Sequence, residues 1–295
     1  MPTYNFKQQV QVFVVSGGNR HRINVTDVSF SQTFSENSFP VKTLHALSNV
    51  FEGSVINKAN VASFSFTFPA LVEADYTIIE TLLLEATSFD LFVKTEADTF
   101  KLESAVITNG SFVIERSRPL SIQIQGQAIK LSRNATLTGS LQSRSSTSNF
   151  TLPIIDITVG SISLSDVVSV SMELQNEIEW TPYSTINAAL SATNASNSMY
   201  PTGFTLSKKI LSGSITQYLT DENVSNVQDW DTDVSLTIKA GNGLTASSFR
   251  GFSMGPATCS FTNRVGSGTI FTQSYDWRMT QNPSSLATIL KYETD

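Results

Sequence analysis

The sequence predicts a mainly β protein made of two tandem units, each with sandwich- or barrel-forming strands and one helix. Three observations predict this fold class. Charged residues make up only 15% of the 295 residues, against ~25% in an average soluble domain, while Ser and Thr are abundant. Apolar and small polar residues alternate over several segments, as expected of strands with one buried face. Related segments also recur about 140 positions apart.

The recurrence indicates an internal duplication. The motif Ile-Asn-Val-Thr-Asp-Val at 23–28 is echoed by Ile-Ser-Leu-Ser-Asp-Val at 162–167, and later segments match at offsets of 140 to 145. Their common order and nearly constant spacing predict two similar domains. We expect these domains to be residues 1–139 and 140–295. A linker is expected at about 133–149, where Ser, Thr, Gly and Arg dominate.

Each unit shows the same succession of strands. Alternation predicts strands at 28–35, 61–68, 89–94, 103–114 and 120–131 in the first unit, and at 168–175, 202–210, 234–239, 249–261 and 269–279 in the second. Turns are expected between them, at Asn109-Gly110, Gly241-Asn-Gly243 and Gly266-Ser-Gly268.

One helix is expected in each unit. After Pro69, apolar residues recur at helical spacing with carboxylates on the other side, which predicts a helix over about 70–87. The equivalent segment of the second unit, Ser214 to Asp231, is more polar. Two long irregular stretches, Phe39 to Asn60 and Trp180 to Pro201, are rich in Asn, Ser and Ala and are expected to form extended loops or hairpins.

Residue types that carry chemistry are sparse. The single cysteine, Cys259, excludes an internal disulfide and a thiolate zinc site, and the two histidines, His21 and His45, exclude a histidine-rich metal site. Gly251-Phe-Ser253-Met-Gly255 has the form of a hydrolase nucleophile elbow, but it lies between predicted strands and both histidines precede it. We therefore predict a structural protein with no catalytic residues, no metal and no cofactor.

The order of the elements resembles a known family. The tandem β-units, the helix after the Phe64–Phe68 strand, and the phrases Gly110-Ser-Phe112-Val-Ile and Leu120-Ser-Ile-Gln-Ile-Gln-Gly126 are similar to the tail tube proteins of long-tailed bacteriophages. More narrowly, the chain is similar to the variant with two tube domains fused in one chain. This similarity implies that three chains form a ring with pseudo-sixfold symmetry. The known fusion variant carries an extra immunoglobulin-like domain, for which this chain has no room.

The resemblance also implies a location and partners. It implies a homotrimer, made in the host bacterial cytoplasm, whose rings stack into the hollow tube of the virion tail. The implied partners are the tail terminator, the tape measure, the baseplate or tip proteins, and a sheath where the tail is contractile. DNA would pass through the lumen without specific binding. The net charge of −6 fits a surface that must not hold DNA.

Two groups of residues are candidates for function in such a tube. The polar faces of four strands would line the lumen: Ser29, Ser31, Thr33, Ser63, Ser65, Thr67, Ser169, Ser171, Glu173, Gln175, Thr205 and Ser207, with Lys209 as the only basic residue on these faces. The two long stretches would contact the next ring, through His45, Asn49, Asn57, Asn187 and Asn194.

Two alternatives stay open at this point. Another tube-like tail or injection component, such as a terminator or initiator ring, would share the fold and form only one or a few rings. A tandem β-sandwich binding module would instead show clustered exposed aromatic residues or a metal loop.

Overall fold

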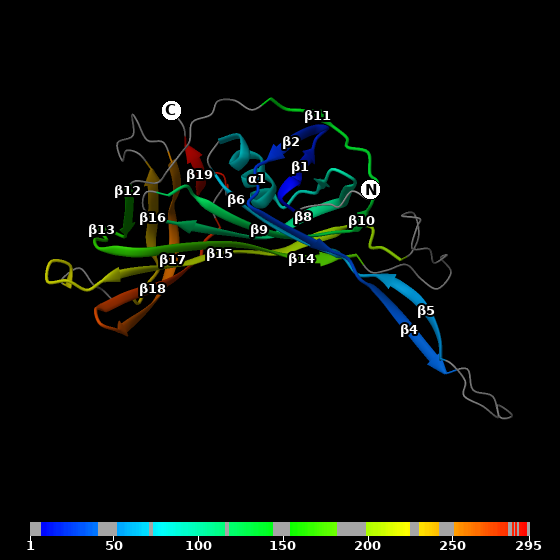
Figure 1. The fold of residues 1–295 in the computed structure, drawn as a ribbon. Coiled ribbons are helices and arrows are strands. Elements are labelled where there is room, and N and C mark those ends of the chain that lie inside the picture. The colour runs from blue at the N-terminus through cyan, green and yellow to red at the C-terminus, as the bar shows by residue number, and fades with distance from the viewer. Residues whose placement is uncertain are drawn as a thin grey trace.

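The computed structural model describes residues 7–40, 52–70, 73–115, 118–143, 154–181, 199–224, 230–241, 251–282, 285, 287 and 289–293. Over these residues the protein is mainly β, as predicted, with one α-helix packed on large sheets (Figure 1). Within the described ranges no helix is long and apolar enough to cross a membrane.

The strands fall into two sets joined by a short strand. A 3-10 helix, Lys7–Gln9, precedes β1. The first strand set comprises β1 (Gln11–Ser16), β2 (Asn19–Ile23), β3 (Asp27–Ser31), β4 (Phe34–Pro40), β5 (Glu52–Ala59), β6 (Ala62–Pro69), β7 (Phe89–Lys94), β8 (Thr99–Ile114), β9 (Ser121–Ala128) and β10 (Lys130–Ser132), with α1 (Glu73–Glu85) between β6 and β7. After β11 (Ser140–Leu141), the second strand set comprises β12 (Ile154–Val159), β13 (Ile162–Ser163), β14 (Val167–Trp180), β15 (Phe204–Tyr218), β16 (Val234–Gly241), β17 (Gly251–Ser267), β18 (Phe271–Met279) and β19 (Leu290–Glu293).

Both strand sets pair in the same order. In the first set β3 pairs with β6, β6 with β9, β9 with β8, β8 with β7, β7 with β1 and β1 with β2, while β10 adds to β8. In the second set β14, β15, β18, β17, β16, β12 and β13 follow one another in the same way, and β19 adds to β17. All these pairings are antiparallel.

Strand β8 belongs to two sheets. Its first half pairs with β7 and β10, and its second half pairs with β9 on one edge and with β14 on the other. Through β14 the sheet continues into the second strand set. Strands β3, β6, β9, β8, β14, β15, β18 and β17 therefore form one continuous sheet, which we call the long sheet (Figure 1).

The hydrophobic core covers one face of the long sheet. In β6 the side chains of Phe64, Phe66 and Phe68 are buried, whereas Ser63 and the other intervening residues point away from the core. Full burial of one such aromatic side chain stabilises the fold by about 1.5–3 kcal/mol. The predicted alternation of the segment 61–68 is confirmed.

Helix α1 closes the core of the first strand set. Its buried residues Tyr76, Ile79, Leu82 and Leu83 recur at helical spacing, and the helix packs against β8 and β2. It ends before Ala86, which has a positive φ of 52°. The helix predicted over about 70–87 is therefore confirmed, over a shorter range.

The helix expected in the second unit is wrong over its described part. Ser214–Tyr218 completes β15, and Ile215 alternates into the core as a strand residue does. The chain then turns, and the Thr220 amide donates to Asn223 Oδ1 at 2.9 Å. The segment forms a strand and not a helix because β15 has strand partners on both edges, β14 and β18. Residues 225–229 lie outside the described ranges.

Several predicted strands differ in extent. The strand expected at 28–35 is divided into β3 and β4 at Gln32 and Thr33, and the strand expected at 120–131 is divided into β9 and β10 at Ile129. Strands β14, β15 and β17 are longer than predicted. Their length follows from pairing, because β14 and β15 run along each other from Trp180 to Val167.

One predicted turn is wrong and another is confirmed. Asn109-Gly110 lies inside β8, since both edges of β8 are paired there. A Cβ atom on Gly110 would lie 2.5 Å from Cδ2 of Leu83, so glycine serves helix packing at this position. The turn at Gly266-Ser-Gly268 does separate β17 from β18. Gly241 ends β16, and the two residues that follow it lie outside the described ranges.

The predicted linker contains a strand. In its described part, which ends at residue 143, β11 pairs parallel with β2, with Ser140 opposite Asn19. The rest of the segment 133–149 lies outside the described residues.

Candidate functional site

The face of the long sheet opposite the core, here called the polar face, carries mostly small polar side chains. The ladder registers place Ser29, Ser65, Gln125, Asn109 and Gln175 side by side on β3, β6, β9, β8 and β14. One polar face thus crosses from the first strand set to the second without interruption.

The next row of the polar face extends it into the second strand set. Ser171, Ser214, Asp276 and Thr262 lie side by side on β14, β15, β18 and β17. These residues alternate with buried side chains such as Met172. The alternation explains why the sequence predicts two-faced strands in this region.

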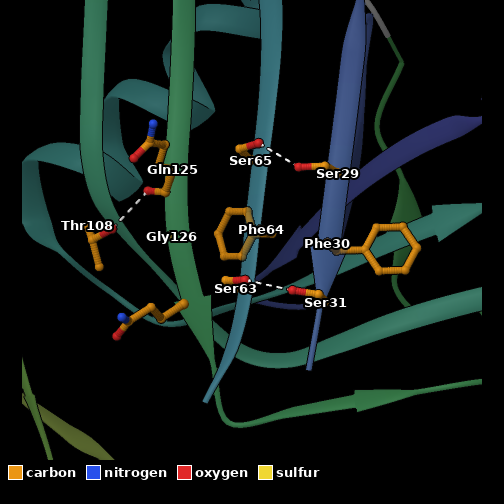
Figure 2. Close-up of a pocket in the computed structure, with 10 residues that line it drawn as sticks. Ser29, Phe30, Ser31, Ser63, Phe64, Ser65, Thr108, Gln125 and Gly126 are labelled. Atoms are coloured by element: carbon orange, nitrogen blue, oxygen red, sulfur yellow. Dashed lines mark hydrogen bonds between the residues drawn. The ribbon is translucent and has the colours of Figure 1, made fainter. Parts of the chain in front are cut away.

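Hydroxyl groups pair across neighbouring strands of the polar face. Figure 2 shows two of these pairs, between β3 and β6. The oxygen–oxygen distances are 2.8 Å for Ser29 and Ser65, 3.1 Å for Ser31 and Ser63, 2.9 Å for Ser171 and Ser214, and 3.0 Å for Thr216 and Ser274. Each cross-strand pair contributes about 0.2–1 kcal/mol and helps to fix the register.

A shallow hollow of about 460 Å³ opens on the polar face over β6 and β9 (Figure 2). Its lining includes Phe64 and Gly126, which face each other on β6 and β9. At one side, the Thr108 hydroxyl donates to the carbonyl oxygen of Gln125 at 3.3 Å. The described residues that line the hollow are Ser, Thr, Gln, Phe and Gly, and none of these supplies an acid, a base or a charged group.

Three ion pairs lie on the polar face. Lys208 Nζ lies 3.0 Å from a carboxylate oxygen of Glu177, and Arg264 lies 3.6 Å from Asp276. Lys7 pairs with the Asp27 carboxylate, and their hydrogen bond lowers the pKa of Asp27. Such exposed pairs add little stability, but they reduce the free positive charge that the face offers.

Most of the predicted lumen residues share this face. Ser29, Ser31, Ser63, Ser65, Thr67, Ser169, Ser171, Glu173 and Gln175 all lie on it, by their registers. Thr205 also lies on it, opposite Glu179. Thr33 lies between β3 and β4, where its hydroxyl accepts a hydrogen bond from Asn60 Nδ2 at 2.8 Å.

Phe204 and Leu206 lie on the face of β15 opposite Thr205, but outside the main core. Leu206 is 37% exposed, and Phe204 packs on Trp180 with 5.4 Å between ring centroids, away from the main core. A bulge at Ser207 changes the alternation of β15, and the Ser207 hydroxyl donates to the Glu177 carbonyl oxygen. The inward strand segment opposite β14 begins further along β15.

The same bulge exchanges two lysines. Lys208, opposite Glu177, lies on the polar face, where Lys209 was expected. Lys209 instead points to the core side and donates to the carbonyl oxygen of Leu84, and burial lowers its pKa. A bulge has no local sequence signal here, so alternation alone assigns the wrong lysine.

The predicted contacts to a neighbouring ring lie mostly outside the described residues. His45, Asn49, Asn187 and Asn194 are among the residues not described, and Asn57 lies in β5. The β4–β5 hairpin projects from the body of the molecule (Figure 1). Its base is held by a small cluster in which Ala59, Met199 and Tyr200 are buried.

Two residues with side chains that can act as nucleophiles lie within a paired strand. Ser253 lies within β17, which pairs there with both β16 and β19, so the Gly-x-Ser-x-Gly segment forms no strand-to-helix turn. Cys259 is fully buried in the same strand, and burial raises its pKa to about 12. Its thiolate, the reactive form, is therefore disfavoured.

Sequence reasoning missed the two open edges of the long sheet. Among the described residues, β3 pairs only with β6, and after Cys259 β17 pairs only with β18. Val265, beyond this point, is 63% exposed. Unpaired strand edges bind further strands readily. Strand partners are not encoded locally, and the sequence alone does not distinguish a valine on an open edge from one in the core.

Over the described residues, the protein is built on an extended sheet with one polar face and open edges. Residues 73–294 match the family described as the Bacteriophage Baseplate Tube Protein Family. The match covers most of the chain, and the chain therefore belongs to this family. A search of curated proteins found no match.

Family membership gives the protein a structural role in the tube of a phage tail or baseplate, and a location in the virion tail. It confirms the phage tube resemblance at that level. The matched range begins at α1 and ends after β19, so it contains β7 to β10 of the first strand set and all of the second, and leaves β1 to β6 outside.

Proposed function

We propose that the protein forms the rings of a hollow phage tube through which DNA leaves the capsid. One observation carries this proposal: over the described residues β8 and β14 join the two strand sets edge to edge, and the counterparts of these two strands lie at the two open edges of the same sheet. In the pairing order, β17 is the counterpart of β8 and β3 is the counterpart of β14. A head-to-tail contact of this kind closes into a ring when its rotation allows.

The proposed ring contains three chains. If residues 1–139 and 140–295 are equivalent tube domains, three chains supply six domains to one ring with pseudo-sixfold symmetry. Half of the junctions would then lie within chains and half between them. Closure removes the open edges of every chain, which otherwise favour aggregation.

The polar face is proposed to line the lumen. It is the face that the core leaves exposed, and its hydroxyls, amides and carboxylates hold water well. Lys and Arg supply most of the electrostatic attraction for phosphate, and two of the basic residues on this face, Lys208 and Arg264, each have a carboxylate neighbour. DNA would therefore pass without specific binding.

Contacts between successive rings are proposed for the two long segments, 39–60 and 180–201. The projecting β4–β5 hairpin places the first of them away from the body of its own chain (Figure 1). His45, Asn49, Asn57, Asn187 and Asn194 are the proposed contact residues. The tape measure, the terminator, the baseplate or tip proteins and a sheath are the proposed partners of the assembled tube.

The family description favours one position along the tube. Because it names the baseplate, we place the protein in the tube segment at the baseplate, as an initiating ring or a short stack, in a tail assembled in the host cytoplasm. The alternative is the main tail tube, which stacks without a fixed end in the absence of partners.

Negative-stain microscopy with native mass spectrometry of the purified protein tests this function. We expect rings of three chains. Single rings or short stacks would support the baseplate position, and long hollow tubes would support the main tube. A protein that stays monomeric at high concentration, or a ring of six chains, would contradict the proposal.

A further inference from the structure

The junction inside the chain has a defined register and a dry core side. Strands β14 and β8 are antiparallel, with Ser171 opposite Val113 and Met172 opposite Phe112. Phe112 and Met172 are 2% and 1% exposed. Four residues after Met172 on β14, the side-chain amide of Asn176 donates to the carbonyl oxygens of Leu83 and Ile107, at 2.9 and 3.0 Å.

The ladder registers identify which residues of the two strand sets correspond. Ser29 and Ser171 occupy the same place, because each faces a serine on the next strand and each lies six residues before the bulge of its hairpin, which follows Ser35 in the first strand set and Glu177 in the second. Continuing across the sheet gives two parallel rows: Ser29, Ser65, Gln125 and Asn109 in the first strand set, and Ser171, Ser214, Asp276 and Thr262 in the second.

From this correspondence we infer that β3 of one chain pairs with β17 of the next chain in the register of the internal junction. Ser29 then lies opposite Gly266, Phe30 opposite Val265 and Ser31 opposite Arg264. The partner is a second copy of this chain. The inference rests on the proposed ring and specifies the contact that closes it.

The side chains on the two open edges suit this pairing. Val265 is 63% exposed, although it lies on the core side of the sheet, opposite the buried Gln273. Its counterpart inside the chain is the buried Phe112. Phe30 is half-buried and packs on Phe100, with 5.1 Å between ring centroids. Pairing places Val265 against Phe30 and removes the apolar surface of both from water.

The proposed junction between chains is more apolar than the internal one. Phe34, the counterpart of the hydrogen-bonded Asn176, is 43% exposed. In the proposed register it approaches Phe261 of the next chain, which corresponds to Ile107. Phe261 already packs on Trp230, with 5.1 Å between ring centroids. An aromatic contact would thus replace the amide that secures the internal junction.

Cysteine crosslinking tests the register. The in-register pair Ser29→Cys with Gly266→Cys is compared with Ser31→Cys with Gly266→Cys, which is displaced by two residues on the same face. A disulfide needs Cα atoms within about 7 Å, a limit that the displaced pair exceeds. The buried Cys259 stays in both variants, and the unmodified chain shows its background. We expect covalent trimers, without longer products, from the in-register pair alone after mild oxidation.

A single substitution tests the apolar contact independently. Val265→Asp is expected to abolish rings in native mass spectrometry while thermal unfolding of the monomer stays unchanged, because the side chain is exposed in a single chain. Leu141→Asp, at a position 58% exposed on β11, is the matched control and should leave rings intact.

The outcomes separate this contact from the proposed function. The inference would be overturned, and the proposed ring retained, if rings form normally and either the displaced pair crosslinks or neither pair does. Normal rings of the Val265→Asp variant would have the same meaning. An unmodified chain that forms no rings, together with no crosslinked trimer from the in-register pair, would overturn both.

Discussion

The hairpin β4–β5 and the outer half of the hairpin β14–β15 are counterparts that run in different directions. Both have a bulge at the corresponding place, with Asn57 extra in β5 and Ser207 extra in β15. In the second strand set the ladder continues from Val167 to Trp180, whereas in the first it stops after β3 and resumes at Phe34 as a separate two-stranded sheet.

One side chain explains the break. Gln32 donates to the carbonyl oxygens of Asn60 and Ile129, at 2.9 and 3.2 Å, and accepts from the Leu131 amide at 2.9 Å. Its counterpart is Leu174, which is fully buried and cannot form such bonds. The comparison teaches that one amide side chain can replace local ladder bonds and separate a projecting hairpin from its sheet.

The largest expected effect concerns the two faces of both strand sets. Phe66→Lys and Ile215→Lys should each prevent folding, because an unpaired charge would enter the core, where these side chains are 1% and 0% exposed. The neighbouring Ser65→Lys and Ser214→Lys should change the free energy of unfolding by less than about 1 kcal/mol. Soluble yield and chemical denaturation measure both. A tolerated lysine at Phe66 or Ile215 would mean that the faces are reversed.

A second prediction compares two glycines that face aromatic rings. In the first strand set a Cβ on Gly126 would overlap the ring of Phe64, and in the second a Cβ on Gly213 would lie 2.7 Å from Trp277 Cζ2. The aromatic residue lies on β6 and the glycine on β9 in the first strand set, whereas the glycine lies on β15 and the aromatic residue on β18 in the second. Valine at either glycine should lower the free energy of unfolding by about 3 kcal/mol.

Gly203→Val is the control for both glycine variants, since no atom lies within 4 Å of its Cβ position. Denaturant unfolding measures all three. Equal stability of the Gly126 variant and the control would contradict the close approach of ring and backbone.

The third prediction tests the origin of the projecting hairpin. Gln32→Leu should lower the free energy of unfolding by about 1–3 kcal/mol, because Leu131 N–H and the carbonyl oxygens lose their partner. Hydrogen exchange should show faster exchange at the Leu131 amide. The exposed Gln8→Leu is the matched control. An unchanged exchange rate at Leu131 would show that another group holds the break.

The smallest effect concerns α1, the helix described only in the first strand set. Burial raises the pKa of Glu80 from 4.5 to about 7, so the folded state binds a proton that the unfolded state releases. Stability is therefore highest below pH 4.5 with respect to this group and falls as the pH rises to about 7.

Glu80→Gln should remove that fall. Because the side chain is partly exposed, solvent screening reduces the gain at pH 8 to about 1 kcal/mol. Thermal unfolding at pH 5 and pH 8 measures it, with the exposed Glu222→Gln as control. An identical pH dependence of the wild type and the Glu80 variant would exclude Glu80 as its source.

The elements predicted well are those with a local signal. The alternation around Phe66 and the helical spacing of Ile79, Leu82 and Leu83 appear within a few neighbouring residues, and the structure confirms both. The family resemblance came from the order of such elements. Outward-facing serines followed directly from the buried residues between them.

The elements predicted poorly depend on partners far away in the sequence. The local sequence predicts a turn at Gly110, but this residue pairs with β14 inside a strand. It predicts a polar helix around Ile215, but this residue has strand partners on both sides. The bulge at Ser207 reverses the direction of Lys208 and Lys209. The junction of β8 with β14, on which the proposed ring depends, joins residues that no local pattern connects.

The paired hydroxyls of the polar face affect how it would treat a moving polyanion. Each serine hydroxyl has one hydrogen, and in the Ser29–Ser65 and Ser31–Ser63 pairs one of the two hydrogens is used within the pair. Each pair therefore offers incoming groups more lone pairs than hydrogens. Phosphate oxygens need hydrogens, whereas water can use either. Such a lining would keep its water film as DNA advances and would act as a lubricated wall.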